Sequence, residues 1–188
     1  LTRDNDLSVV THSSGNHAAA LALASSMRKI PAYIIMPENA PRIKINAVQS
    51  YGGKIVFCKP TLAERERTCN EIMEQTGAVL IHPYNNHDII AGQASCAAEI
   101  IEDVPNADYI ISPVGGGGLL SGSCLSAHYF GEGIQVLGAE PKGADDAYRS
   151  LRDKIIYPSV NPNTIADGLL TSLGDKTYPI IAEFCAGI

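Results

Sequence analysis

The sequence predicts an α/β protein with parallel sheets, helices on both faces and two lobes. Short β-branched runs alternate with longer amphipathic stretches along most of the chain, and this alternation is typical of βαβ units around a parallel sheet. The chain has 188 residues, 45% of them hydrophobic, which is enough for one full α/β domain or for parts of two.

The strands and helices are expected in strict alternation. The predicted strands are rich in β-branched residues and end at glycine, proline or polar residues; they are expected at 8–10, 32–36, 54–58, 78–81, 109–113 and 134–139. Helical periodicity and end signals predict helices at 17–28, 42–51, 62–75, 89–101 and 118–129, with a weaker pair at 145–151 and 178–185.

A polar stretch at 82–88 is the expected crossing between the lobes. Residues 1–80 are expected to form most of a small lobe that carries a substrate-binding loop. Residues 81–188 are expected to form part of a larger, cofactor-binding lobe. Prolines near 158–162 predict a surface loop that leads toward a site at 164–168.

Composition narrows the range of partners. The formal net charge of -6 argues against nucleic acid and anionic membranes, because neither would be attracted to an acidic protein. No apolar run approaches the roughly 20 residues needed to span a bilayer, and no leader-like segment opens the sequence. The five cysteines are scattered without metal-ligand spacing, so we expect reduced thiols in a cytoplasmic protein with a small-molecule partner.

Four consecutive glycines, Gly115, Gly116, Gly117 and Gly118, lie between a predicted strand and a predicted helix. Without Cβ atoms, successive N–H groups can surround an anion, and the start of the helix adds positive partial charge. This pattern favours phosphate binding over a flexible loop or a tight turn. The absence of a following Gly-Lys-Ser/Thr excludes a P-loop.

A dinucleotide site is the rival interpretation of the same glycines. Glu140 ends the next predicted strand at about the distance expected for a ribose-binding acid. However, a GxGxxG pattern starting at Gly116 would need a glycine where Ser121 stands. An NAD-dependent oxidoreductase therefore remains the weaker alternative.

A second candidate anion site follows the first strand, at Ser13, Ser14, Gly15, Asn16 and His17. Here a strand turns directly into the start of an alanine-rich helix, which leaves free N–H groups and two hydroxyls near one point. The competing interpretation is that Ser14 or Asn16 only caps the helix, a contribution of about 1 kcal/mol. The residues alone leave both interpretations open.

Taken in order, residues 13–17, the glycine run with Leu119, and Thr-Ile-Ala-Asp-Gly at 164–168 resemble the fold-type-II pyridoxal-phosphate (PLP) enzymes of the tryptophan synthase beta-like fold. The specific likeness is to the serine racemase and serine/threonine dehydratase branch. Stretches at 31–37, 51–53, 82–84 and 91–93 also match. The resemblance implies a serine racemase, or an L-serine or L-threonine ammonia-lyase, that acts on small hydroxy amino acids as a homodimer.

The resemblance also implies residue roles. The glycine run, Leu119 and Gly168 would bind PLP, and residues 13–17 would hold the substrate carboxylate, with Asn16 near the phenolic oxygen of the cofactor. Ser14 would move a proton on the face opposite the cofactor lysine. A serine here, where many threonine dehydratases have alanine, favours racemase-like chemistry.

An acidic loop carries the third candidate site. Glu140 and Asp146 flank a tight turn, and carboxylates suit hard divalent cations, although composition alone favours a solvated acidic loop or acids at a helix start. The resemblance implies that Glu140, the Ala144 carbonyl and Asp146 hold Mg²⁺, Ca²⁺ or Mn²⁺.

The lysine that carries the cofactor in this family precedes the 13–17 segment in a Ser-x-Lys motif. None of the lysines here lies in such a motif, so we expect a central fragment that is inactive by itself. A non-catalytic regulatory module on the same scaffold is the remaining alternative. The five histidines lack ligand spacing, and structural or surface roles are expected for them: His12, His17, His82, His87 and His128.

Overall fold

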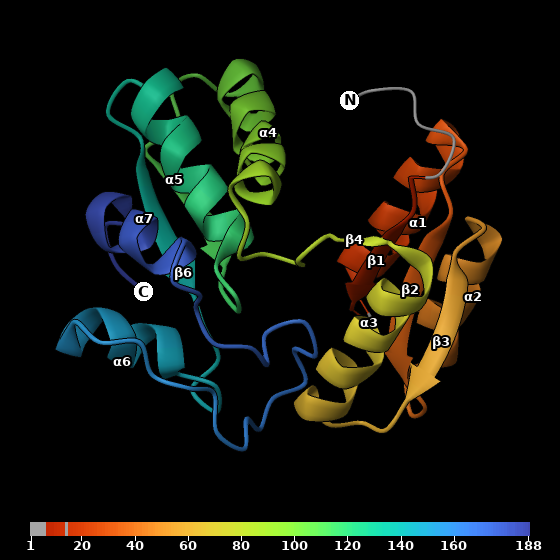
Figure 1. The fold of residues 1–188 in the computed structure, drawn as a ribbon. Helices are drawn as coiled ribbons and strands as arrows, with labels where there is room; N and C mark the ends of the chain where they lie inside the picture. The colour runs from red at the N-terminus through yellow and green to blue at the C-terminus, as the bar shows by residue number, and fades with distance from the viewer. Residues whose placement is uncertain (1–6, 14) are drawn as a thin grey trace. The chain divides into compact units, whose positions relative to one another are not determined.

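The computed structural model describes residues 7–13 and 15–188, with the backbone alone at Leu62. The chain divides into two compact units, Leu1–Pro83 and Tyr84–Ile188 (Figure 1). Each unit contains its own parallel sheet, which confirms the predicted α/β class.

Unit 1 is built on a parallel sheet of four strands. The strand order is β3-β2-β1-β4, and the register runs from Val9 opposite Ala32 to His12 opposite Ile35. The strands are β1 (Val9–His12), β2 (Ala32–Pro37), β3 (Lys54–Cys58) and β4 (Val79–Leu80).

Three helices cover the two faces of this sheet: α1 (Asn16–Arg28), α2 (Arg42–Ser50) and α3 (Leu62–Thr76). On one face, α1 and α2 bury small or branched side chains against alternate strand residues, in a core that includes Ala22, Val48 and Ile34. On the other face, α3 contributes Cys69 to a core with Val10 and Ile35. Ile34 and Ile35 face opposite sides because side chains alternate along a strand, so the sheet is buried on both faces.

Unit 2 pairs a two-stranded parallel sheet with four helices. Strands β5 and β6 align from Tyr109 opposite Gln135 to Pro113 opposite Ala139. The elements are α4 (His87–Asp103), β5 (Tyr109–Pro113), α5 (Gly118–Phe130), β6 (Gln135–Ala139), α6 (Asp146–Asp153) and α7 (Thr177–Phe184).

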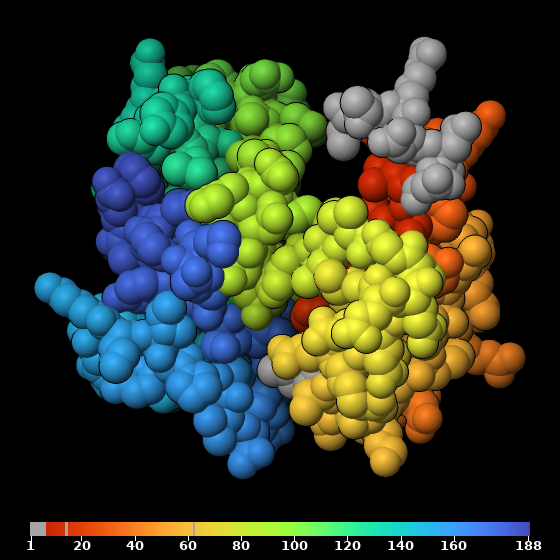
Figure 2. Space-filling model, viewed as in Figure 1, coloured from red at the N-terminus to blue at the C-terminus, as the bar shows by residue number. Residues whose placement is uncertain are grey.

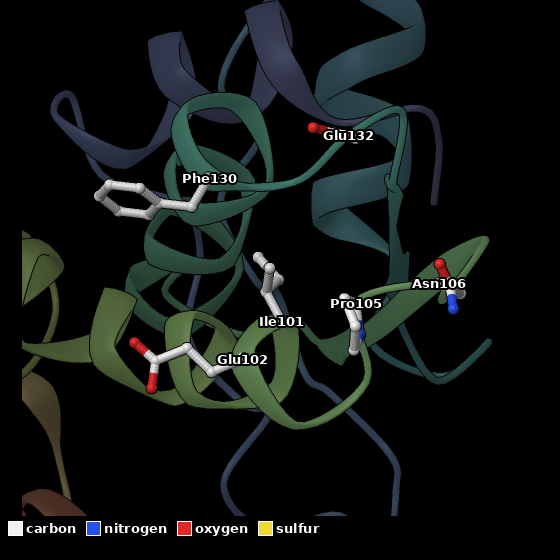
Figure 3. A pocket seen from close by; sticks show the side chains of 6 residues that line it. All are labelled: Ile101, Glu102, Pro105, Asn106, Phe130 and Glu132. Atoms are coloured by element: carbon white, nitrogen blue, oxygen red, sulfur yellow. The ribbon is translucent and has the colours of Figure 1, made fainter.

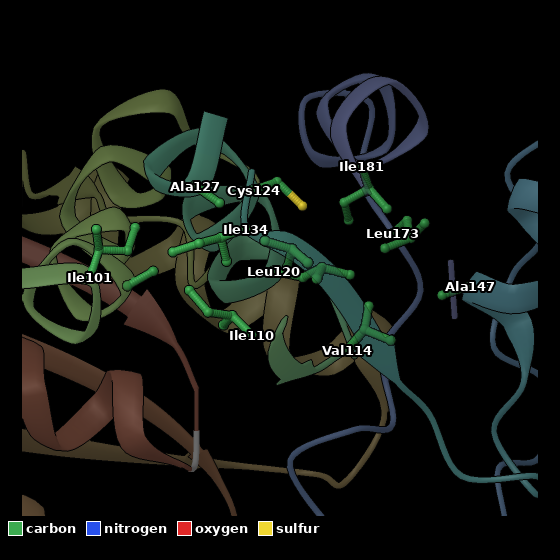
Figure 4. Close-up of a cluster of buried hydrophobic side chains, with 12 residues drawn as sticks. Ile101, Ile110, Val114, Leu120, Cys124, Ala127, Ile134, Ala147, Leu173 and Ile181 are labelled. Atoms are coloured by element: carbon green, nitrogen blue, oxygen red, sulfur yellow. The ribbon is translucent and has the colours of Figure 1, made fainter. Parts of the chain in front are cut away.

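Helix α5 lies at the centre of the core of unit 2 (Figure 4). Its Gly122 approaches α4 so closely that a Cβ would lie 2.5 Å from the Ala94 nitrogen, and the Ser126 hydroxyl donates a 2.6 Å hydrogen bond to the Ala94 carbonyl. Helix α7 packs on α5 through Ile181, and the dark blue atoms near the C-terminus adjoin the green-blue atoms of the middle of unit 2 in the space-filling view (Figure 2). Small residues in α5 therefore allow helices to pack on it closely.

Each predicted strand and helix is present, with ends that move by a few residues. The helix predicted from residue 89 begins at His87, because the Asn86 side chain accepts hydrogen bonds from the amides of Asp88 and Ile89. The strand predicted over 78–81 shortens to Val79–Leu80. Among the described residues, no helix combines the length and apolar character required to cross a membrane.

Candidate functional site

The four glycines at 115–118, called the glycine cradle below, are buried between β5 and α5. Gly117 adopts a left-handed conformation with φ of 87° and precedes the first residue of α5, where no side chain caps the helix. Glycine tolerates this conformation at little cost. The amides at the start of α5 are therefore not used by a side-chain cap, as an anion site at a helix start requires.

Distant segments pack against the cradle where side chains would otherwise lie. A Cβ on Gly116 would lie 2.3 Å from the ring of Tyr84, and one on Gly115 would lie 3.1 Å from the Gly168 carbonyl. Gly168, which was predicted to bind the cofactor, therefore lies beside the cradle. Leu119 follows it as a half-buried residue in the first turn of α5.

Thr177 holds the cradle from the side of α7. Its hydroxyl donates to the Gly116 carbonyl at 2.8 Å and accepts from the Gly174 amide at 2.9 Å. The Ser121 hydroxyl donates to the Thr177 carbonyl at 3.2 Å. The hydroxyl of Thr177 is thus a buried positioning group for the second glycine of the cradle.

The site residues predicted from the sequence did not include Thr177, Tyr84 or the neighbouring Asn85. The Asn85 side chain donates to Asp175 at 2.7 Å and accepts from the Lys176 amide at 2.9 Å, so it fixes the loop before α7. Tyr84 lies in the family-like stretch 82–84, but nothing in the sequence indicates the partners of the three residues, which lie tens of residues away in the chain. A helix start predicted at 178 was the nearest signal.

At the second candidate site, Gly15 precedes α1 as its N-cap, with no side-chain cap hydrogen bond. The Ser13 hydroxyl accepts a 3.3 Å hydrogen bond from the Gly15 amide, and Asn16 is exposed as the first residue of the helix. Asn16 is therefore not the cap that the competing interpretation allowed. Ser14 lies outside the described residues, so its predicted roles stay predictions.

His17 and His12 are both partly buried in unit 1. The Nε2 atom of His17 donates to the Ile81 carbonyl at 3.3 Å, and burial lowers the pKa of His17. Burial, aided by Arg65, also lowers the pKa of His12, whose ring meets that of His82 edge to face at 5.6 Å. Both His17 and His12 thus favour the neutral form.

The acidic loop places its two carboxylates differently. The two oxygens of Glu140 accept 2.9 Å hydrogen bonds from the amides of Ala147 and Tyr148 in α6. Asp146 is 2% exposed, and its Oδ2 atom has no hydrogen-bond partner among the described residues. Ala144, which lies between them in the sequence, is buried.

The electrostatics of this loop fit a cation. Burial raises the pKa of Asp146, against the opposing effects of the Ser159 side chain and the charge of Arg149. Burial and the neighbouring Asp146 and Asp145 charges raise the pKa of Glu140, against its two amide donors. The described part of the chain holds no group of three or more His, Cys, Asp or Glu side chains suited to a metal, and the predicted set contains only two, completed by a carbonyl. An unpartnered buried carboxylate oxygen is nevertheless what a divalent cation would compensate.

Two surface pockets lie away from the predicted residues. One, of about 370 Å³, lies in unit 2 and is drawn in Figure 3. The other, of about 260 Å³, lies in unit 1 beside His12 and His82. The lining of the first consists of Ile101, Glu102, Pro105, Asn106, Phe130 and Glu132. Neither pocket is lined by a residue predicted to bind substrate, cofactor or metal.

A parallel α/β fold with a buried glycine cradle at a helix start is typical of phosphate-binding α/β proteins. Comparison with known proteins identifies the family. Residues 2–188 match the family described as pyridoxal-phosphate dependent enzyme, and the chain belongs to that family, which confirms the predicted resemblance.

Individual relatives support the same branch. The chain is 50% identical over 182 residues to a serine racemase of Dictyostelium discoideum, covering 96% of this chain and 56% of the relative. It is 44% identical to a beta-hydroxyaspartate dehydratase of Paracoccus denitrificans, covering 96% and 57%. The solved structure of maize serine racemase superposes with a TM-score of 0.93 at 47% identity, covering 95% of this chain and 54% of that one. The chain thus spans about half the length of these relatives.

Proposed function

We propose that the parent protein of this chain is a PLP-dependent enzyme that racemises serine and eliminates water from L-serine or L-threonine, releasing ammonia. The observation that carries the proposal is the buried glycine cradle before α5, closed by the backbone at Gly168. Relatives and solved structures named serine racemase, dehydratase and threonine deaminase support the reaction class.

In this proposal the glycine cradle binds the phosphate of PLP. The cofactor supplies an electron sink for the α-carbon of the substrate when bound. Backbone N–H groups of residues 115–118 and the start of α5 hold the phosphate, while Leu119 and Gly168 complete the cofactor site. Thr177 orients the Gly116 peptide through its 2.8 Å hydrogen bond, so the cradle is preorganised before the cofactor arrives.

The segment at 13–17 binds the substrate carboxylate in this proposal. Amides at the start of α1 are free of a side-chain cap, and Ser13 orients the amide of Gly15. The resemblance assigns Asn16, which is exposed, to the cofactor. Burial lowers the pKa of His17, which donates to the Ile81 carbonyl, and Ser14 moves a proton at the substrate α-carbon.

The proposal includes a cation at the acidic loop, held by Glu140, the Ala144 carbonyl and Asp146. Because Asp146 Oδ2 is buried without a partner among the described residues, Mg²⁺, or Ca²⁺ or Mn²⁺ in its place, would neutralise it. Since Glu140 also binds the amides of α6, the ion would stabilise the start of that helix. A cytoplasmic homodimer completes the proposal; the five free cysteines suit a reducing compartment.

The dinucleotide alternative has little support from this geometry. Ser121, at the third glycine position of the fingerprint, is fully buried and bonded to Thr177. A regulatory module without turnover is distinguished only by assay.

The test uses the full-length parent protein. We expect a visible absorption band from PLP, pyruvate and ammonia from L-serine, and D-serine from L-serine. Ser14→Ala should reduce racemisation more than elimination, because only racemisation needs a proton on the face that Ser14 serves. The PLP band without either product would indicate a regulatory module, and equal loss of both activities would remove Ser14 from the proposed role.

A further inference from the structure

Two cysteines of unit 2 meet where α5 and α7 pack together. Cys124 lies on α5 and is 1% exposed in the hydrophobic core; its sulfur points toward α7 in Figure 4. Cys185 follows the last residue of α7, packs against the same core and is only half-buried. The two thiols interact with each other, although they lie far apart in the sequence, and the Cys185 thiol also donates to the Gly187 carbonyl at 3.2 Å and the Val136 carbonyl at 3.4 Å.

Their environments make the two sulfurs chemically unequal. The hydrogen bond from Cys124 lowers the pKa of Cys185, and hydrogen bonds with the backbone of Gly187 and Gly138 act in the same direction, against burial. The same contact and burial raise the pKa of Cys124. Since the thiolate is the reactive form, the more accessible sulfur is also the better nucleophile.

We propose that Cys185 and Cys124 are a redox modification site at which a hydroperoxide drives formation of an intramolecular disulfide. The Cys185 thiolate attacks the peroxide, so an S–O bond forms, the O–O bond breaks and the released oxygen leaves as water or an alcohol. The Cys124 sulfur then attacks the sulfenic acid. An S–S bond forms, and the leaving hydroxide takes the Cys124 proton as water.

The remaining thiols lack this combination of a close partner and access. Burial raises the pKa of Cys58 and of Cys69, and both are buried in unit 1. Cys96 is exposed on α4 and serves as a matched control, because peroxide reaches it without a neighbouring thiol to resolve the product.

The disulfide would add a covalent link between two helices that hydrogen bonds already connect near the cradle. Near the cradle, Ser121 of α5 donates to the Thr177 carbonyl, and the Thr177 hydroxyl donates to Gly116. A bond between Cys124 and Cys185 would fix the α5 and α7 pair a second time. A disulfide that closes the long loop between Cys124 and Cys185 constrains the unfolded chain. The oxidised protein should therefore be the more heat-stable form.

The experiment treats the full-length protein with hydrogen peroxide, alkylates the remaining thiols and maps unreduced peptides by mass spectrometry. We expect one linked pair containing Cys124 and Cys185, lighter by two hydrogen atoms than the separate thiol peptides and reversed by a dithiol reductant. The Tm should rise by several degrees on oxidation, and Cys185→Ser should abolish both changes. This readout does not depend on PLP or on catalysis.

Variants of the two sulfurs separate the steps. In Cys124→Ser the reaction should stop at a Cys185 sulfenic acid that a dimedone probe captures, and Cys124→Ala repeats this test without placing a hydroxyl in the core. Cys96→Ser should keep the linked pair. Oxidation of Cys96 while both members of the pair stay alkylatable would overturn the inference, as would a disulfide joining Cys124 to any other cysteine.

Discussion

Replacing Gly116 with alanine tests whether the close packing of the cradle depends on the missing side chain. A Cβ at this position would lie 2.3 Å from Tyr84 Cγ and 2.4 Å from both Cδ atoms, distances that no relaxed contact allows. The ring must therefore move, and overpacking of this kind costs about 1–3 kcal/mol. For a domain of roughly 150–250 residues that corresponds to a Tm lower by roughly 2–12 °C.

The matched control is Gly92→Ala on α4, where a Cβ meets no atom within 4 Å. Alanine should stabilise a helix interior by about 0.5–1 kcal/mol, so the two variants should move the Tm in opposite directions. Calorimetry on the full-length protein freed of cofactor measures stability, and PLP titration then measures affinity separately. Combining Gly116→Ala with Tyr84→Ala should reduce the destabilisation that alanine causes at this position.

An unchanged Tm in Gly116→Ala would refute the packing argument, because the ring would then be free to leave without cost. If the double variant regains a higher Tm than Gly116→Ala but still binds PLP weakly, the amide geometry of the cradle itself is needed for the phosphate. If the PLP affinity of the double variant recovers together with its Tm, the weak binding of Gly116→Ala is instead caused by the displaced Tyr84 ring.

Three further predictions concern buried polar groups. Thr177→Val should lower the free energy of unfolding by about 1–3 kcal/mol, because it leaves the buried glycine carbonyl without its donor; Thr177→Ser should restore most of the loss. Burial lowers the pKa of His17, so the unfolded chain binds more protons, and stability should fall as the pH drops through 6.5 and below. The fall in Tm between pH 7 and pH 5 should be smaller in His17→Gln, which keeps a donor, and unchanged in His87→Gln at an exposed position. Mg²⁺ should raise the Tm of the wild type and of Asp145→Asn, which removes a carboxylate already paired with Arg149, but not of Asp146→Asn; an equal rise in all three would place the ion elsewhere.

The elements of the fold could be predicted from local sequence because each carries its own signals. Thr61 and Gly77 delimit α3 as cap residues, and the β-branched run at 109–113 becomes β5 at the predicted residues. Contacts made by distant residues could not be predicted in this way. The ring of Tyr84 rests on Gly116, and nothing local to either residue indicates the other.

The acidic loop shows why a correct list of residues still leaves the geometry open. The sequence marked Glu140 and Asp146 as equivalent oxygen donors, yet only Glu140 lies where the free amides of α6 can reach both of its oxygens. Asp146 is the first residue of that helix and turns its carboxylate inward. The helix start thus already compensates one charge and leaves the other, so the loop can be intact without a cation while still gaining stability from one.

The glycine cradle is likewise shaped by two kinds of cause, local backbone conformation and packing against distant segments. Glycine at 117 permits the left-handed turn that starts α5, which is a local requirement. Its neighbours need to be small because Tyr84, Gly168 and Thr177 come from other segments and lie where side chains would project. Four glycines in sequence therefore satisfy two independent constraints, backbone conformation and close approach, and a substitution should fail for a different reason at each position. At Gly117 both constraints act, since a Cβ would also lie 2.8 Å from Leu173 and Ile181, so this position should tolerate alanine least.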